Sequence, residues 1–152
     1  MKKKIKQIFA EFLEKLLIFK AEIKIKETAG LFELSLDCEE PGRLIGKNGE
    51  TLQAVELLLR LMVSREFKEP VNISLDIAGY KDKRRQEIEK MGERAAESAL
   101  RTGRIQVLLP MNAYERRVVH LILGERDDIE TESIGEEPNR RVMIKVKKKV
   151  LA

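Results

Sequence analysis

The tetrapeptide Gly46-Lys47-Asn48-Gly49 constrains the fold of this chain more than any other stretch of its sequence. It stands between a short helical segment and a long apolar one over residues 50–67, so it predicts a tight joint between two helices. Glycine permits backbone conformations that other residues avoid, and it lets the backbone of a ligand approach main-chain N–H groups. The N-terminus of the following helix adds a partial positive charge, and Lys47 adds a full one. Taken alone, the tetrapeptide also fits an ordinary helix–helix turn.

Alternation of apolar and polar side chains predicts three strands around this joint. Residues 23–26 and 32–38 alternate in this way, and Thr28-Ala29-Gly30 lies between them, which predicts a β-hairpin. Residues 71–77 alternate again after the helix break at Pro70, and they predict a third strand. The order of elements in this part of the chain is therefore helix, strand, strand, short helix, glycine loop, helix and strand.

The first 20 residues resemble a signal peptide only superficially. Their basic start precedes apolar residues, but Glu11 and Glu14 interrupt that run and no small-residue cleavage site follows. One helical stripe collects the apolar side chains, which are Ile5, Ile8, Phe9, Phe12, Leu13 and Leu16. This pattern favours a helix that packs on the core over a helix that lies on a membrane surface.

The helix over residues 50–67 has an unusually broad apolar surface. Its main stripe consists of Leu52, Val55, Leu59 and Met62. Leu57, Leu58 and Leu61 widen that stripe, which predicts that the helix is buried on more than one side.

Gly79 is a natural boundary, so the sequence predicts one domain over residues 1–79 and a second over residues 80–152. The expected elements of the second domain are a charged helix over 81–101, a short strand over 105–109, a helix from Asn112 to near Gly124, and strands over 129–134 and 141–146. Glycine and proline residues separate these elements.

The middle helix of the second domain carries the only histidine of the chain. Asn112 can cap this helix, and Glu115 three residues later is close to a capping-box arrangement. Helical periodicity places Arg116 and His120 together, nearly opposite an apolar stripe. That stripe consists of Tyr114, Val118, Leu121 and Ile122. The pattern therefore predicts an exposed basic face, which is either a functional site or merely solvated, and it disfavours a core histidine.

Charge and cysteine content limit the classes of function. The chain has 152 residues, 30 of them basic and 26 acidic. Residues 1–79 are neutral with 13 of each sign, whereas residues 80–152 carry 17 basic and 13 acidic side chains, so the second domain is the better candidate for touching a polyanion. A single cysteine, Cys38, excludes an internal disulfide and a cysteine-based zinc cluster, and it favours a cytoplasmic protein. No apolar run approaches the roughly 20 residues of a membrane span.

The first domain resembles a type II KH domain, whose element order is the one predicted above. The segment Gly42-Arg43-Leu44-Ile45-Gly46-Lys47-Asn48-Gly49, followed by Thr51-Leu52, is similar to the loop-and-helix signature of that family. The resemblance implies that Gly46, Lys47, Asn48 and Gly49 clamp the backbone of a single strand, and that Leu44 and Ile45 help to form an apolar groove for its bases. The second loop position is often basic in the family, and here it is Asn48.

The second domain resembles the nucleic-acid-binding domain named for its Arg-x-x-x-His motif, with Arg116 and His120 at those positions. The wider match includes Pro110-Met111-Asn112, Thr131-Glu132-Ser133 and the run from Gly135 to Val142. A KH domain followed by this domain is similar to the Jag (SpoIIIJ-associated, KhpB/EloR-like) family of bacterial RNA-binding proteins. Members often carry a further N-terminal domain and linker, so the chain corresponds to a short member or to a piece of a longer one.

The resemblance and the residue chemistry together predict an RNA contact surface in the second domain. Its candidate residues are Arg116, Arg117, His120, Arg140, Arg141 and Lys145. Arginine can hold phosphate through two parallel hydrogen bonds, and histidine can donate to phosphate or stack on a base. An alternative for Arg140 and Arg141 is a local ion pair with Glu136 or Glu137. Lys147–Lys149 is expected to be a solvated tail with only diffuse attraction for RNA.

The sequence thus predicts an α+β protein of two small α/β-sandwich domains: an αββααβ type II KH domain and a domain with a three-stranded sheet packed on helices. The expected function is non-enzymatic binding of single-stranded RNA, or of single-stranded DNA, in post-transcriptional regulation, which the family links to cell elongation, division or sporulation. The alternative is an adaptor that pairs through its KH domain, with itself or with a small single-KH protein, and docks on an acidic partner or a membrane surface. No metal, cofactor or catalytic residue is expected, because nucleophile motifs, a Walker-type loop and a second histidine are all missing.

Overall fold

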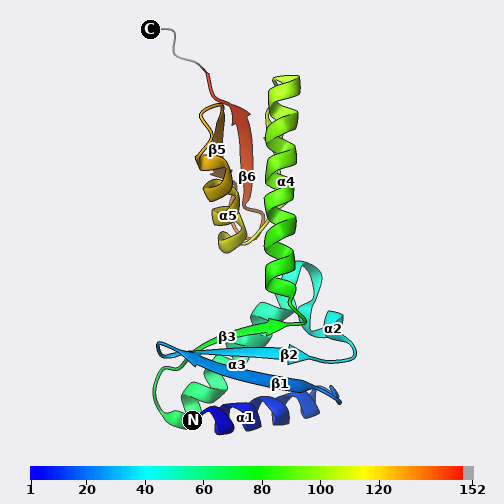
Figure 1. Ribbon diagram of the computed structural model, residues 1–152, viewed down its shortest axis with the longest axis vertical. Helices are drawn as coiled ribbons and strands as arrows, with labels where there is room; N and C mark the ends of the chain where they lie inside the picture. Colours follow the sequence, from blue (N-terminus) through cyan, green and yellow to red (C-terminus); the bar gives the residue numbers. More distant parts are fainter. Residues whose placement is uncertain (149–152) are drawn as a thin grey trace. The chain divides into compact units, whose positions relative to one another are not determined.

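The computed structural model describes residues 1–148. The chain divides into two compact units, Met1–Asp82 and Lys83–Ala152. Each unit contains one three-stranded sheet and its own hydrophobic core (Figure 1). The boundary that the sequence predicts after Gly79 falls at the start of the helix α4 (Tyr80–Thr102), whereas the compact units separate just after its first turn.

The first unit has the αββααβ order that the sequence predicts. Its elements are α1 (Lys2–Lys15), β1 (Glu22–Thr28), β2 (Leu31–Asp37), α2 (Pro41–Ile45), a 3-10 turn η1 (Lys47–Gly49), α3 (Glu50–Phe67) and β3 (Asn72–Ile77). Strand β2 is central, antiparallel to β1 and parallel to β3. Ala29 and Gly30 join β1 to β2, both with positive φ (49° and 80°), as a two-residue hairpin of right-handed twist requires. Cys38 lies just beyond the end of β2.

One face of this sheet is covered by helices, and the core lies there. Leu34 of β2 is paired in register with Leu75 of β3, and both are at most 1% exposed. Helix α1 packs against the same core through Ile5, Phe9 and Leu13. The core-packing interpretation of the first helix is therefore confirmed.

Helix α3 is buried on one side only, so the prediction that it is buried on more than one side is wrong. Its buried residues are Leu52, Val55, Leu59 and Val63, at spacings of three and four residues. Leu57, Leu58 and Leu61 are 45%, 47% and 56% exposed. The physical reason is geometric: a helix on one face of a three-stranded sheet meets the sheet along a single stripe, and no other element within residues 1–82 covers its outer side.

The second unit contains α4, β4 (Gln106–Val107), α5 (Ala113–Gly124), β5 (Ile129–Ile134) and β6 (Arg141–Val146). Strand β6 is central and antiparallel to both β4 and β5, so the predicted three-stranded sheet packed on helices is confirmed. The strand predicted over 105–109 is shorter than expected. Leu108 points into the core, whereas Ile105, Val107 and Leu109 are each more than half exposed.

Helices α4 and α5 pack closely because a glycine lies between them. Gly92 of α4 is buried, and a Cβ atom added there would lie 3.2 Å from Cδ1 of Ile122 on α5. Ile88, Ala96 and Ala99 complete the buried side of α4. These small side chains let α4 and α5 approach each other. Within residues 1–148, no helix combines the length and the apolar character needed to cross a bilayer.

Two neighbouring leucines of α3 provide a matched test of this packing. Leu59 is 0% exposed and Leu58 is 47% exposed. We expect Leu59→Ala to lower the free energy of unfolding of the first unit by about 2–5 kcal/mol, because it leaves a cavity in the core. Leu58→Ala should change that free energy by less than about 0.5 kcal/mol. Urea unfolding followed by circular dichroism measures both, and equal losses would contradict one-sided burial of α3.

Candidate nucleic-acid interface

The glycine loop has a backbone that few residues other than glycine can adopt. Gly46 has φ 70° and ψ −175°, a region that is essentially restricted to glycine. Gly49 follows in the left-handed region with φ 79° and ψ 13°. Asn48 is also left-handed, with φ 52° and ψ 26°. Asparagine tolerates this conformation better than most side chains, which gives a physical reason for its presence where related loops often carry a basic residue.

Close packing behind the loop is a second reason for its glycines. A Cβ atom at Gly49 would lie 2.8 Å from Cε1 of Tyr80, and one at Gly46 would overlap the side chain of Thr51. Tyr80 and Thr51 therefore support the loop from inside the unit. Sequence reasoning assigned no role to Tyr80, because nothing local connects the first turn of α4 to the loop.

The outer side of the loop is open to solvent. Lys47 and Asn48 are exposed, whereas Leu44 is 3% exposed and belongs to the core. Of the two predicted groove residues, only the half-buried Ile45 therefore offers surface. The 18-residue helix α3 begins at Gly49 without a side-chain cap. Its first N–H groups thus have no capping partner from Gly49, which is the arrangement that favours an anion at a helix N-terminus.

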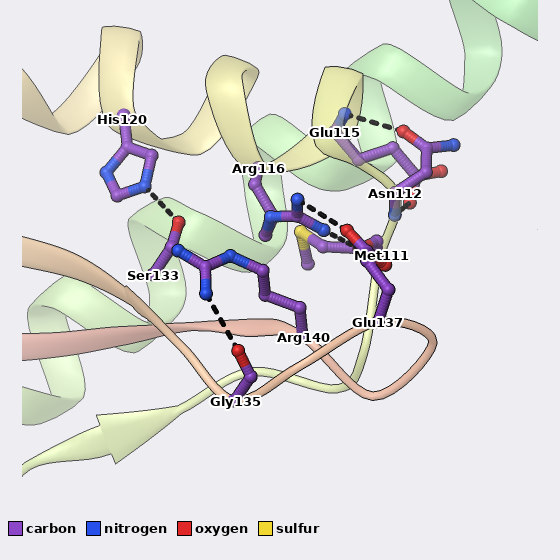
Figure 2. A network of polar contacts seen from close by, with 9 residues as sticks. All are labelled: Met111, Asn112, Glu115, Arg116, His120, Ser133, Gly135, Glu137 and Arg140. Carbon is purple, nitrogen blue, oxygen red and sulfur yellow. Dashed lines mark hydrogen bonds and ion pairs between the residues drawn. The ribbon is translucent and has the colours of Figure 1, made fainter.

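Helix α5 begins in the opposite way, with the capping box that the sequence suggests. Asn112 Oδ1 accepts from the backbone N–H of Glu115, and the carboxylate of Glu115 accepts from the backbone N–H of Asn112 (Figure 2). The other carboxylate oxygen of Glu115 accepts from Nε of Arg84, at 2.8 Å. This end of α5 is therefore closed by its own side chains.

Arg116 is buried, so the prediction that it lies on an exposed face is wrong. It is 8% exposed, and its guanidinium donates to the carbonyl oxygen of Met111 and to Oε1 of Glu137, at 2.6 and 2.8 Å (Figure 2). Glu137 belongs to the turn between β5 and β6. Arg116 therefore joins the start of α5 to that turn, and its hydrogen bonds are directed inward.

The predicted apolar stripe of α5 is wrong for the same geometric reason. Tyr114 and Leu121 are 58% and 66% exposed. The buried residues are Glu115, Arg116, Val118, Val119 and Leu123. Both α4 and the sheet contact α5, so the buried arc turns toward Val119 and includes polar side chains that find partners there.

His120 is half-buried and held by two hydroxyl groups of β5. Its Nδ1 lies 2.7 Å from Oγ1 of Thr131, and its Nε2 lies 2.7 Å from Oγ of Ser133. A neutral imidazole can satisfy both contacts, since one nitrogen donates and the other accepts. Burial lowers the pKa of His120 below its ordinary value of 6.5, and the nearby charge of Arg116 lowers it further. The sequence alone did not connect this histidine to Thr131 and Ser133.

The turn from Gly135 to Arg141 is braced by main-chain contacts. Arg140 donates to the carbonyl oxygen of Gly135 at 2.7 Å, and Arg141 donates to that of Asn139 at 3.1 Å. Neither arginine forms the ion pair with residues 136–137 that the sequence offered as an alternative; within the described residues, Arg116 takes that role with Glu137.

The predicted basic residues do not form one continuous surface. Arg116, His120 and Arg140 gather around the turn (Figure 2). Arg117 is exposed on the outer side of α5. Arg141 and Lys145 alternate with buried residues of β6 and so lie on the other face of the sheet, where Lys145 is 3.7 Å from Glu130. In the predicted basic tail, Lys147 and Lys148 are exposed, and Lys149 lies outside the described residues.

Comparison with known proteins agrees with this architecture. Residues 2–77 match the family described as KhpA/KhpB, KH domain, and residues 86–146 match the domain family named for the Arg-x-x-x-His motif. The chain belongs to the KhpB family. It is 34% identical to the RNA-binding protein KhpB of Clostridium symbiosum over 126 residues, which cover 83% of this chain and 57% of that protein.

Two further relatives show how the resemblance is distributed. Identity to the RNA-binding protein KhpB of Bacillus subtilis is 27% over 144 residues, which cover 93% of this chain and 69% of that relative. The RNA-binding protein KhpA of Chlamydia pneumoniae is 34% identical over 76 residues, which cover 47% of this chain and 94% of KhpA. This KhpB family member thus spans little more than half the length of the C. symbiosum relative.

The lowered pKa of His120 predicts a pH-dependent stability for the second unit. Unfolding restores an ordinary pKa near 6.5, so below that pH the unfolded chain takes up a proton that the folded one disfavours. We expect the free energy of unfolding to fall as the pH drops from 6.5 toward the folded pKa, and to be unaffected by this group above 6.5. Proton NMR of the single histidine gives that pKa, and urea unfolding gives the stability. His120→Gln should remove this dependence, and an NMR pKa above 6.5 would contradict it.

Proposed function

We propose that this protein binds single-stranded RNA through both of its units and has no enzymatic activity. The observation that carries the proposal is the glycine loop, whose exposed Lys47 and Asn48 stand beside the N-terminus of α3, which has no side-chain cap. Its relatives are named as RNA-binding proteins. By family resemblance, we further propose that it acts in the cytoplasm as a post-transcriptional regulator linked to cell elongation, division or sporulation.

The loop suits phosphate because three features act at one place. The N–H groups at the start of α3 point outward with the partial positive charge of the helix dipole. Lys47 contributes a full charge, and the absence of a Cβ at Gly46 lets a backbone come close. None of these features reads a base, so we propose binding with little sequence preference from the loop itself.

The second unit contributes in a different way. Arg117 is exposed and Arg140 is half-buried, and these two can reach a phosphate without disturbing the fold. Arg116 is the less accessible member of the motif, since its hydrogen bonds hold the turn between β5 and β6. We propose that Arg116 and His120 act mainly by shaping the surface that carries the other basic residues.

Salt dependence provides the test of RNA binding. We expect the affinity for a labelled single-stranded RNA, measured by fluorescence anisotropy, to fall as salt rises, because phosphate contacts release counterions. Lys47→Ala and Arg117→Ala should each weaken binding and flatten the slope of log K against log salt by about 0.7, one phosphate contact. Single-stranded DNA as competitor measures the preference for RNA.

Lys26→Ala is the matched control for charge, because Lys26 is an exposed lysine on β1, away from both proposed contact sites. It should leave the slope unchanged. Wild-type affinity that does not depend on salt would overturn the proposed function. Variants of Arg116 are unsuitable here, because they also remove hydrogen bonds that hold the fold.

The exposed leucines of α3 favour a second function, pairing through the KH unit. Leu57, Leu58 and Leu61 form an apolar surface with 45–56% exposure on the side of α3 that no element within residues 1–82 covers. An uncovered apolar surface of this kind favours association with another protein. We propose that it pairs with a second KH unit, of this chain or of a small single-KH protein, rather than with an acidic partner or a membrane surface.

The double variant Leu58→Glu with Leu61→Glu should abolish this pairing without unfolding the unit, because both side chains are exposed. Sedimentation equilibrium over a range of protein concentrations measures the association of the wild type and of the variant. The same experiment with a small single-KH protein separates self-association from mixed pairing. A wild type that stays monomeric in both mixtures would contradict the pairing proposal.

A further inference from the structure

Three residues of α5 form an exposed stripe that the fold does not use. Tyr114, Arg117 and Leu121 are spaced by three and four residues, so they lie along one side of the helix, which we call the outer stripe. Tyr114 is 58% exposed, Leu121 is 66% exposed and Arg117 is exposed between them. The opposite side of α5 already carries the core contacts of the unit.

The outer stripe has the chemistry that the motif residues lack. Both ring nitrogens of His120 are held by hydroxyl groups, and the guanidinium of Arg116 is directed to Met111 and Glu137. Arg117, by contrast, forms no ion pair with any residue of the described part of the chain. An aromatic ring and an unpaired guanidinium are thus presented together to solvent.

We propose that the outer stripe is a stacking platform for the bases of single-stranded RNA. The ring of Tyr114 stacks on a base, Arg117 contacts the phosphate of the same or the next nucleotide, and Leu121 offers an apolar surface for a neighbouring base or sugar. Single-stranded nucleic acids are bound in this way by aromatic side chains beside basic ones, with little dependence on sequence. The inference rests on the proposed RNA-binding function and names the surface by which the second unit performs it.

Charge favours RNA over a protein as the occupant of this surface. The stripe contains a basic residue and no acidic one, and residues 80–152 carry 17 basic against 13 acidic side chains. Glu115, the acidic residue in the first turn of α5, is buried and paired with Arg84. A strand of phosphates therefore meets an unpaired positive charge on this side of α5 and no carboxylate within the stripe.

The absence of tryptophan from the chain permits a direct test. Tyr114→Trp places a single tryptophan on the outer stripe, and stacking on a base quenches its fluorescence. We expect quenching when a 20-nucleotide oligouridine or oligoadenine RNA is added. Leu100→Trp is the control on the same unit, because position 100 lies 16 residues beyond Arg84 on α4, about 24 Å along the helix. Its emission should not change.

Affinity measured by anisotropy with the same RNA completes the test. Tyr114→Ala should weaken binding about tenfold, the loss of one stacked base, and Tyr114→Phe should restore it, because stacking needs the ring and not the hydroxyl. Thermal unfolding of both variants should match the wild type, since Tyr114 lies outside the core. Bound RNA without quenching at position 114 would overturn the stacking platform and leave the stripe to a protein partner. Absence of RNA binding by the wild type would overturn the proposed function itself.

Discussion

The inward-directed guanidinium of Arg116 is the contact on which the second unit depends most. It lies under the start of α5 and donates both to the carbonyl oxygen of Met111 and to the carboxylate of Glu137. Hydrogen bonds from a charged donor contribute about 1.5–3 kcal/mol each, and loss of this side chain would leave a buried carbonyl oxygen without its partner. The turn between β5 and β6, and with it the position of Arg140, is therefore set by a residue that the motif alone presents as a ligand contact.

The two units treat their helix N-termini in opposite ways, and this difference explains how each meets a nucleic acid. Helix α5 is closed by Asn112 and Glu115, so its first N–H groups are partly satisfied within the protein. Helix α3 begins at Gly49 with no side-chain cap, and the supporting contacts of Tyr80 and Thr51 lie on the inner side of its loop. The first unit thus offers backbone donors, whereas the second offers side chains on the surface of α5.

Elements were predictable where one local rule decided them. Alternation located β1, β2 and β3, and the strands β5 and β6 have the predicted bounds. The αββααβ order followed from these patterns and from the glycine loop. Faces were less predictable, because a leucine carries the same local signal whether or not another element covers it. Leu58 and Leu59 of α3 differ in exposure for that reason alone.

By itself, the sequence determined the elements, the tight joint at Gly46–Gly49, the capping box of α5 and the family, since periodicity, backbone restriction and motif spacing are local properties of a chain. Only the tertiary structure decided which groups remain available to a ligand. Glu137, Thr131 and Ser133 are distant from α5 in the sequence, and their contacts turn Arg116 and His120 inward. The same packing leaves Tyr114 and Arg117 at the surface, because a helix between another helix and a sheet has only one side left for solvent.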